Sequence, residues 1–186
     1  MGKKLVALID CQNDFIDGAL GVGYDKWIKA YDYIEKELLP LEEGKEYVFT
    51  LDSHPKNHCS FKPHGGPWPA HCVDGTSGAK VYWKLEDWMA KEGFTYSYMK
   101  KGMDPDKEEY GIDVLKFYQP EDNITEAHIA GLCTDYCVKE SAIMTAKAHP
   151  DVKVFVHLNG SAFITEETAN VAIEEMKKVS NIELVK

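Results

Sequence analysis

The chain has 186 residues, of which 44% are hydrophobic, and its formal net charge is −10 at pH 7. This length and apolar content are typical of one globular domain with a single core, so we expect one domain over residues 1–186. The negative charge argues against nucleic acids and anionic membranes as partners. No apolar run approaches the roughly 18 residues of a membrane span.

The five cysteines predict reduced thiols rather than a disulfide framework, because their number is odd and no Cys-x-x-Cys pair is present. A Lys-Lys pair near the N-terminus precedes a short apolar run, but no small-residue cleavage site follows it, so we expect no secretion signal. Reduced thiols are typical of the cytoplasm, which is the location we expect. Whether the chain forms a homo-oligomer is left open.

Apolar runs of strand length alternate along the chain with segments of helical spacing. The first run, residues 3–9, ends at Asp10, and helical spacing follows from Trp27 to Leu41. Further strands are expected at 47–54, 94–102, 128–132, 152–158 and 182–186. Further helices are expected at 85–92, 135–148 and 169–179, and at 106–118 with an interruption at Gly111. This alternation predicts a three-layer α/β/α fold around a mostly parallel six-stranded sheet.

Side chains that carry chemistry stand at the carboxyl ends of four predicted strands. In chain order they are Asp10, Asp52, His54, Lys100, Lys101, Cys133 and Cys137. Open parallel sheets bind ligands beyond the carboxyl ends of their strands. We therefore expect these residues to meet at one edge of the sheet.

Asp52 and His54 lie two residues apart at a strand end, so their side chains face the same way. An irregular stretch from His54 to about Val81 is long for a compact domain and carries His71 in a Gly/Pro-rich loop. If that loop returns His71 to the first pair, the three residues form a facial set with open positions for a divalent metal. The alternative is an exposed Asp-x-His that binds nothing. Such a donor set suits zinc, iron and manganese alike.

Cys137 follows a predicted strand and a short turn, near the first turn of the next helix. A helix N-terminus stabilises a thiolate and lowers its pKa, and backbone N–H groups of the same turn could hold an oxyanion. Lys101 and Asp10 are candidates for stabilising the thiolate and shuttling its proton. Two alternatives stay open: Cys137 is a buried apolar residue, or Cys133, closer to the strand end, is the reactive thiol.

Five motifs together resemble the nicotinamidase/pyrazinamidases of the isochorismatase-like cysteine hydrolases, over essentially the whole chain. They are LIDCQNDF at 8–15, DSHPKNHCSF at 52–61, GGPWPAHCVDGT at 65–76, KKG at 100–102 and GLCTDYCV at 131–138. Relatives that use no metal lack the second and third motifs, so these two carry most of the specificity.

The resemblance implies a metal-dependent amidohydrolase that converts nicotinamide to nicotinate and ammonia in NAD salvage, and that also accepts pyrazinamide. It implies a catalytic triad of Asp10, Lys101 and Cys137. In the implied reaction Asp10 takes the thiol proton, Cys137 attacks the amide carbonyl, and ammonia leaves. A water on the metal then hydrolyses the thioester.

The resemblance also implies one divalent metal ion, zinc in preference to iron or manganese, bound by Asp52, His54 and His71. His58 or Ser60 lies where some members add a further ligand, and this point stays open.

For the substrate, the resemblance implies that Phe15 and Trp68 sandwich the pyridine ring. It also implies a cis peptide bond before Cys133, which would turn backbone N–H groups toward the oxyanion.

Two segments depart from the family pattern. Cys133 stands where members usually carry alanine, which is a small change. Residues Tyr110–Asp113 replace a usual Tyr-Ser-Gly-Phe, which leaves substrate preference open. The first alternative is therefore an amidohydrolase of the same superfamily acting on another small amide. A binding module without activity, and a metal-dependent hydrolase in which Cys137 is structural, are further alternatives.

Overall fold

The computed structural model describes residues 2–41 and 44–186. Within them, six strands form one sheet in the order β3-β2-β1-β4-β5-β6, and each neighbouring pair is parallel. The strands are β1 (Lys3–Ile9), β2 (Lys45–Asp52), β3 (Ser97–Lys101), β4 (Ile124–Leu132), β5 (Lys153–Ala162) and β6 (Ile182–Val185). The predicted fold class is confirmed.

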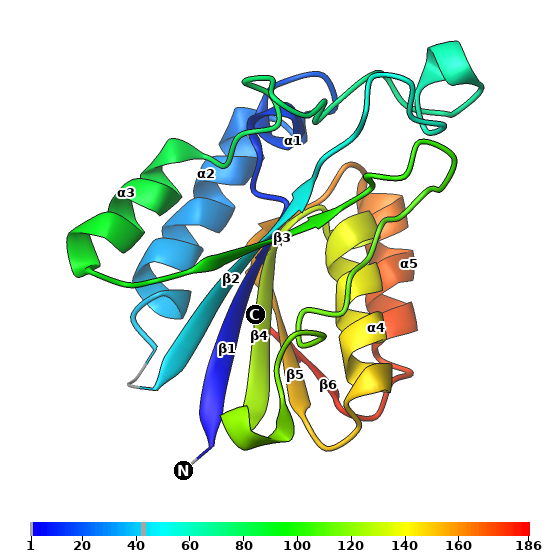
Figure 1. Cartoon of the computed structure of the whole chain (residues 1–186). Helices are drawn as coiled ribbons and strands as arrows, with labels where there is room; N and C mark the ends of the chain where they lie inside the picture. The colour runs from blue at the N-terminus through cyan, green and yellow to red at the C-terminus, as the bar shows by residue number, and fades with distance from the viewer. Residues whose placement is uncertain (1, 42–43) are drawn as a thin grey trace.

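Helices cover both faces of the sheet, as Figure 1 shows, with α2 and α3 on one side and α4 and α5 on the other. The α-helices are α1 (Asn13–Ile16), α2 (Tyr24–Tyr33), α3 (Trp83–Glu92), α4 (Lys139–Ala148) and α5 (Glu166–Met176). The 3-10 turns are η2 (Lys62–His64) and η3 (Pro120–Asp122), and the π-helical turns are η1 (Ile34–Leu38) and η4 (Thr134–Val138). No helix in these described ranges has both the length and the apolar run needed to cross a bilayer.

Strand β1 shows how the two cores form. Val6 and Leu8 are buried in the cluster that contains α2 and α3, whereas Leu5, Ala7 and Ile9 are buried in the cluster of α4 and α5. Successive side chains of a strand point to opposite faces, so an unbroken apolar run is what a strand covered on both faces requires.

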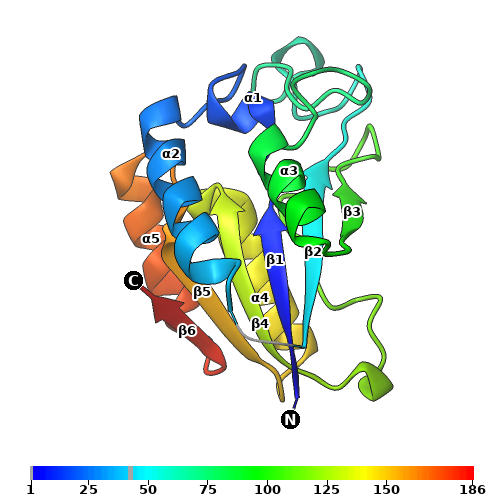
Figure 2. The same ribbon diagram turned by 90° about the vertical axis from the view of Figure 1, so that its left-hand side faces the viewer.

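The strand order changes direction between β1 and β4. The chain proceeds from β1 to β2 and β3 on one side of the sheet, and then returns to place β4 on the other side of β1. A crevice opens beyond the carboxyl ends at such a switch point. Figure 2 shows α1 and the long loops gathered above these ends of β1 and β2.

The irregular stretch after β2 folds back on its own start. The backbone of His54 forms a parallel bridge with Val73, and its N–H donates to the Cys72 carbonyl at 3.0 Å. The loop therefore returns His71 to the neighbourhood of His54, and the two rings lie 4.9 Å apart, centroid to centroid.

The helix predicted over residues 106–118 is wrong: that segment has no regular secondary structure, only turns at 106 and 114–117, and it lies along α4. Its backbone is satisfied by hydroxyl groups of that helix: the Ile112 N–H donates to Ser141 at 3.2 Å and the Val114 N–H donates to Thr145 at 3.1 Å. A Cβ at Gly111 would lie 2.7 Å from the Glu140 backbone. The glycine thus permits a close approach to α4 rather than interrupting a helix.

Candidate active site

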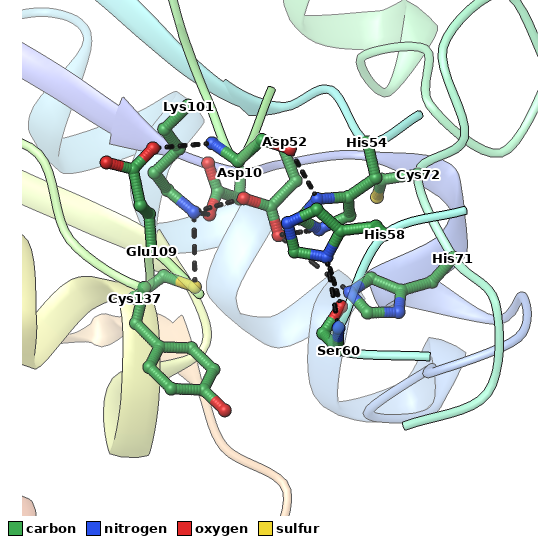
Figure 3. Close-up of polar contacts among 12 residues, drawn as sticks. Asp10, Asp52, His54, His58, Ser60, His71, Cys72, Lys101, Glu109 and Cys137 are labelled. Atoms are coloured by element: carbon green, nitrogen blue, oxygen red, sulfur yellow. Dashed lines mark hydrogen bonds and ion pairs between the residues drawn. The ribbon is translucent and has the colours of Figure 1, made fainter. Parts of the chain in front are cut away.

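Lys101 connects three other site residues, as Figure 3 shows. Its Nζ lies 2.8 Å from Asp10 Oδ2, donates to Asp52 Oδ1, and lies 3.5 Å from Cys137 Sγ. All four side chains are buried. Because they come from four separate segments of the chain, their meeting is a product of the sheet topology.

Asp10 lies just beyond β1 with a φ of 45°, which turns the chain away from the sheet. Thr50 of β2 donates a hydrogen bond of 2.6 Å to Asp10 Oδ1. The other oxygen, Oδ2, faces Lys101 and is therefore the oxygen available to exchange a proton. Burial raises the pKa of Asp10, and the attraction of Lys101 offsets this only in part.

Strand alternation decides which of two adjacent lysines enters the site. Lys101 is the register partner of Asp52 and is buried. Lys100 points to the other face, where it is exposed and pairs with Asp74 at 3.1 Å. Burial lowers the pKa of Lys101, but Asp10 and Asp52 outweigh it and raise the pKa well above its ordinary value, so the amine is an ammonium ion.

Cys137 lies in η4, the turn that leads from β4 into α4. Burial raises the pKa of this thiol well above its ordinary value, although Lys101 acts in the opposite direction. The sequence places Cys137 near a helix N-terminus and so predicts a lowered pKa. In the structure the pKa is raised instead, because the removal of the thiol from water is the larger effect. In the free protein Cys137 is therefore a thiol, and it needs a base when it reacts.

Asp52, His54 and His71 form a buried cluster whose ligand atoms all lie within 4.8 Å of one another. Asp52 Oδ2 lies 3.3 Å from His54 Nε2 and 3.9 Å from His71 Nε2. The Nδ1 atoms point outward to backbone carbonyls, that of His54 to Gly102 and that of His71 to Pro69, each at 2.8 Å. Ligating histidines typically fix their second nitrogen in this way, which leaves Nε2 free for the metal.

The charge states of the cluster also suit a cation. Burial raises the pKa of Asp52, but Lys101 and His54 outweigh it and hold that pKa well below its ordinary value. Burial lowers the pKa of His71, which keeps this imidazole neutral. A carboxylate and a neutral imidazole are the forms that bind a divalent metal. Burial lowers the pKa of His54, but Asp52 outweighs it and raises that pKa, so an ion bound there would displace a proton. With that proton released, the three residues fit such an ion.

Gly102 is a position where only glycine serves. Its φ is 66°, and a Cβ there would lie 2.4 Å from the His54 ring. Its carbonyl is also the partner of His54 Nδ1. The glycine after Lys101 thus lets the backbone orient the His54 ring of this cluster.

His58 and Ser60 lie beside the cluster but contact each other. His58 Nδ1 lies 2.6 Å from Ser60 Oγ, and Nε2 lies 3.0 Å from the Lys107 carbonyl. The His58 ring lies 4.1 Å from the His54 ring, centroid to centroid. With both ring nitrogens engaged, His58 supports the ring of His54 and is not directed at the three-residue cluster.

A small cavity of about 20 Å³ lies beside Cys137. Its wall contains the predicted substrate-binding residues and four others that the sequence did not indicate: Leu20, Glu108, Tyr136 and Ile164. The lining residues are Phe15, Leu20, Asp52, Trp68, His71, Glu108, Tyr110, Cys133, Tyr136, Cys137 and Ile164. The peptide bond between Leu132 and Cys133 is cis, as the resemblance implies.

Trp68 is held in this wall by two tyrosines. Its indole Nε1 donates to the Tyr110 hydroxyl at 3.0 Å, and the Tyr136 ring meets it edge-on at 5.3 Å between centroids. Tyr110 belongs to the segment that departs from the family pattern, and Tyr136 precedes the candidate nucleophile. The sequence signal for Tyr136 is its place directly before Cys137 in the motif GLCTDYCV.

Comparison with known sequences gives a consistent result over the whole chain. The sequence model of the isochorismatase domain family matches residues 4–183. A nicotinamidase/pyrazinamidase of Mycobacterium tuberculosis is 30% identical over 199 residues, covering 98% of each chain. A nicotinamidase of Saccharomyces cerevisiae is 25% identical and covers 98% of this chain and 99% of its own.

Comparison with solved structures agrees. The pyrazinamidase of Pyrococcus horikoshii in complex with zinc superposes with a TM-score of 0.79 at 31% identity, covering 99% of each chain. The yeast nicotinamidase superposes with a TM-score of 0.82 at 26% identity, covering 98% of this chain and 99% of its own.

Proposed function

The chain belongs to the isochorismatase family, and from that membership we propose that it is a cysteine amidohydrolase that converts nicotinamide to nicotinate and ammonia, with pyrazinamide as a second substrate. The observation that carries this proposal is the position of Lys101, whose ammonium contacts Asp10, Asp52 and Cys137 at once. One side chain thereby joins a base, a nucleophile and a metal-binding cluster beside a cavity lined by aromatic rings.

The cluster of Asp52, His54 and His71 would hold one divalent ion, with zinc the first choice because the zinc-bound pyrazinamidase is a relative over the full chain. Such an ion supplies a Lewis acid for the ring nitrogen and for water when bound. The three residues supply one carboxylate and two imidazoles and leave coordination positions open.

In the first half-reaction the amide lies over Cys137, with its ring between Phe15 and Trp68. Asp10 Oδ2 accepts the thiol proton, and Lys101 stabilises the sulfur anion that forms. The sulfur attacks the carbonyl carbon, and backbone N–H groups of the turn at Cys133 and Cys137 hold the oxyanion. The C–N bond then breaks, and Asp10 returns its proton to the departing nitrogen, which leaves as ammonia.

In the second half-reaction water enters the position that ammonia vacates. Asp10 accepts a proton from this water, whose oxygen attacks the thioester carbonyl. The C–S bond breaks, the proton returns from Asp10 to the Cys137 sulfur, and the product leaves as a carboxylic acid that loses its own proton to solvent and becomes the carboxylate. A raised pKa suits Asp10 to both halves, because it must take and return a proton near neutral pH.

The deciding experiment is ammonia release from a panel of small amides, with nicotinamide and pyrazinamide first. We expect both to be hydrolysed. Turnover of an aliphatic or a benzene amide without turnover of nicotinamide would favour the alternative amidohydrolase. The panel includes other amides because Glu108, which is exposed, and Tyr110, from the segment that departs from the family pattern, both line the cavity. A cytoplasmic location stays a prediction, and the oligomeric state stays open.

A further inference from the structure

The side-chain amide of Gln12 forms hydrogen bonds with both backbone polar groups of Asp52, a residue of the three-residue cluster. The Asp52 N–H donates to Gln12 Oε1 at 2.9 Å, and Gln12 Nε2 donates to the Asp52 carbonyl at 2.8 Å. Nε2 also donates to the Ala79 carbonyl at 2.8 Å. The Gln12 side chain is fully buried, so each of these groups depends on it for a hydrogen bond.

The end of β1 explains why Asp52 needs this partner. The ladder between β1 and β2 ends at Ile9 and Thr50, because Asp10 turns away from the sheet. On its β1 side the backbone of Asp52 is therefore left without a strand neighbour. The amide of Gln12 presents a donor and an acceptor to Asp52, as a peptide group of a neighbouring strand would, and so continues the ladder to Asp52, while its second N–H donates to Ala79.

Asp14 holds the second ligand-bearing segment in the same manner. Its Oδ2 accepts a 2.7 Å hydrogen bond from the N–H of Cys72, the residue that follows His71, and its Oδ1 accepts from the Ala19 N–H at 3.3 Å. Cys72 has a φ of 45°, a conformation that L-residues seldom adopt without support. Asp14 supplies that support beside the metal cluster.

We propose that Gln12 and Asp14 are positioning residues that set the affinity of the metal site, by fixing the backbone at Asp52 and immediately after His71. This inference rests on the metal site of the proposed function. Ligands that are already fixed lose little freedom when the ion binds, so loss of either support weakens binding although every ligand is still present.

The test measures Zn²⁺ dissociation constants of the full chain by competition with a chromophoric chelator, which requires no catalysis. Removing groups that orient ligands typically costs about 10- to 100-fold in metal affinity. We expect Q12M and D14A to bind Zn²⁺ at least about tenfold more weakly than wild type. The matched control is N13A, because Asn13 lies between them and its side chain donates at 2.9 Å to the Ser77 carbonyl of the same loop rather than to the backbone of Asp52 or Cys72.

N13A should bind Zn²⁺ within about twofold of wild type. Equal affinities for Q12M, D14A and wild type would overturn the proposal, and so would a loss in N13A as large as theirs, which would indicate general loosening of the loop. If Q12M does not fold, Q12E replaces it, because the glutamate keeps the acceptor and loses the donor; an unchanged affinity in Q12E would likewise overturn the proposal.

Zn²⁺ binding and nicotinamide hydrolysis by the wild-type chain are separate measurements. A wild-type chain that binds Zn²⁺ but hydrolyses no nicotinamide would end the proposed substrate and leave the roles of Gln12 and Asp14 intact. A wild-type chain that binds no Zn²⁺ would end this inference, whatever amides it hydrolyses. Thermal unfolding of the metal-free variants shows whether affinity is lost in proteins that are still folded.

Discussion

The ammonium of Lys101 lies 2.8 Å from Oδ2 of Asp10, and less than a twentieth of either residue is exposed. Asp52 is a second buried carboxylate on the same ammonium. One cation thus serves two anions, and the local excess of negative charge favours a divalent ion at the neighbouring histidines.

Replacing Lys101 by Met should lower the free energy of unfolding by about 3–5 kcal/mol, because it leaves buried carboxylates without their cation. Urea unfolding measures the loss. Lys100→Met is the matched control, since the adjacent lysine forms an exposed ion pair with Asp74 and such pairs contribute about 1 kcal/mol or less. Equal losses in the two variants would contradict the buried role of Lys101.

Cys137→Ala should lower kcat by more than about a thousandfold while the fold and metal content are retained, because no other group there can form the acyl intermediate. Cys133→Ala should stay active, since its backbone N–H is proposed to act and its thiol is not. Ammonia release under saturating nicotinamide measures both. The reverse pattern would make Cys133 the nucleophile.

His71→Ala should lose most of the bound divalent ion, because two ligands remain where three are proposed. Metal analysis of purified protein should find about one ion per chain in wild type. His58→Ala should keep its ion, because both nitrogens of His58 already have partners in Ser60 and Lys107. A full metal content in His71→Ala would remove that residue from the site.

Benzamide should be a poor substrate and pyrazinamide a fair one. Benzamide keeps the scissile amide and a flat ring for Phe15 and Trp68, but it has no ring nitrogen for a metal. A buried group left without its partner costs about 1–3 kcal/mol, or roughly a ten- to hundredfold loss in kcat/KM. Steady-state kinetics on the three amides decides this, and equal constants for nicotinamide and benzamide would show that the ring nitrogen is not recognised.

A histidine pair far from the active site predicts acid sensitivity. His157 is buried, with its ring nitrogens 3.0 Å from the Tyr33 hydroxyl and 3.0 Å from His128, which in turn contacts Glu126. Burial, together with His128, lowers the pKa of His157 to about 4. The unfolded chain, with a histidine pKa of about 6.5, therefore binds this proton first as the pH falls.

The contribution of His157 to stability is thus complete above about pH 6.5 and is lost as the pH falls toward 4, a change on the order of 3 kcal/mol. Unfolding free energies at pH 7 and pH 4.5 should differ less in His157→Gln than in wild type. His64→Gln, at an exposed position, is the control and should keep the wild-type difference. An unchanged pH dependence in His157→Gln would contradict a neutral buried ring.

Local patterns in the sequence were sufficient for the sheet and for part of the site. A short apolar run is typical of a strand buried on both faces, which predicted β1, and the alternation of such runs with segments of helical spacing predicted the fold class. The spacing of Asp52 and His54 placed both side chains on one face for the same local reason. Helical spacing gave a wrong prediction for residues 106–118. Backbone N–H groups there donate to hydroxyl groups of α4, about 30 residues away, and a local pattern does not reveal such distant partners.

Tertiary structure decided which residues meet and in what protonation state. The choice of Lys101 over Lys100 depends on the register of β3 against β2, and the return of His71 depends on backbone pairing across the loop at Cys72. Burial raises the pKa of Cys137, whereas its position near a helix N-terminus, which the sequence predicted, would lower that pKa. Distances, register and desolvation arise only when separate segments pack together, and therefore the sequence identified the reactive residue types while packing determined their arrangement and charge.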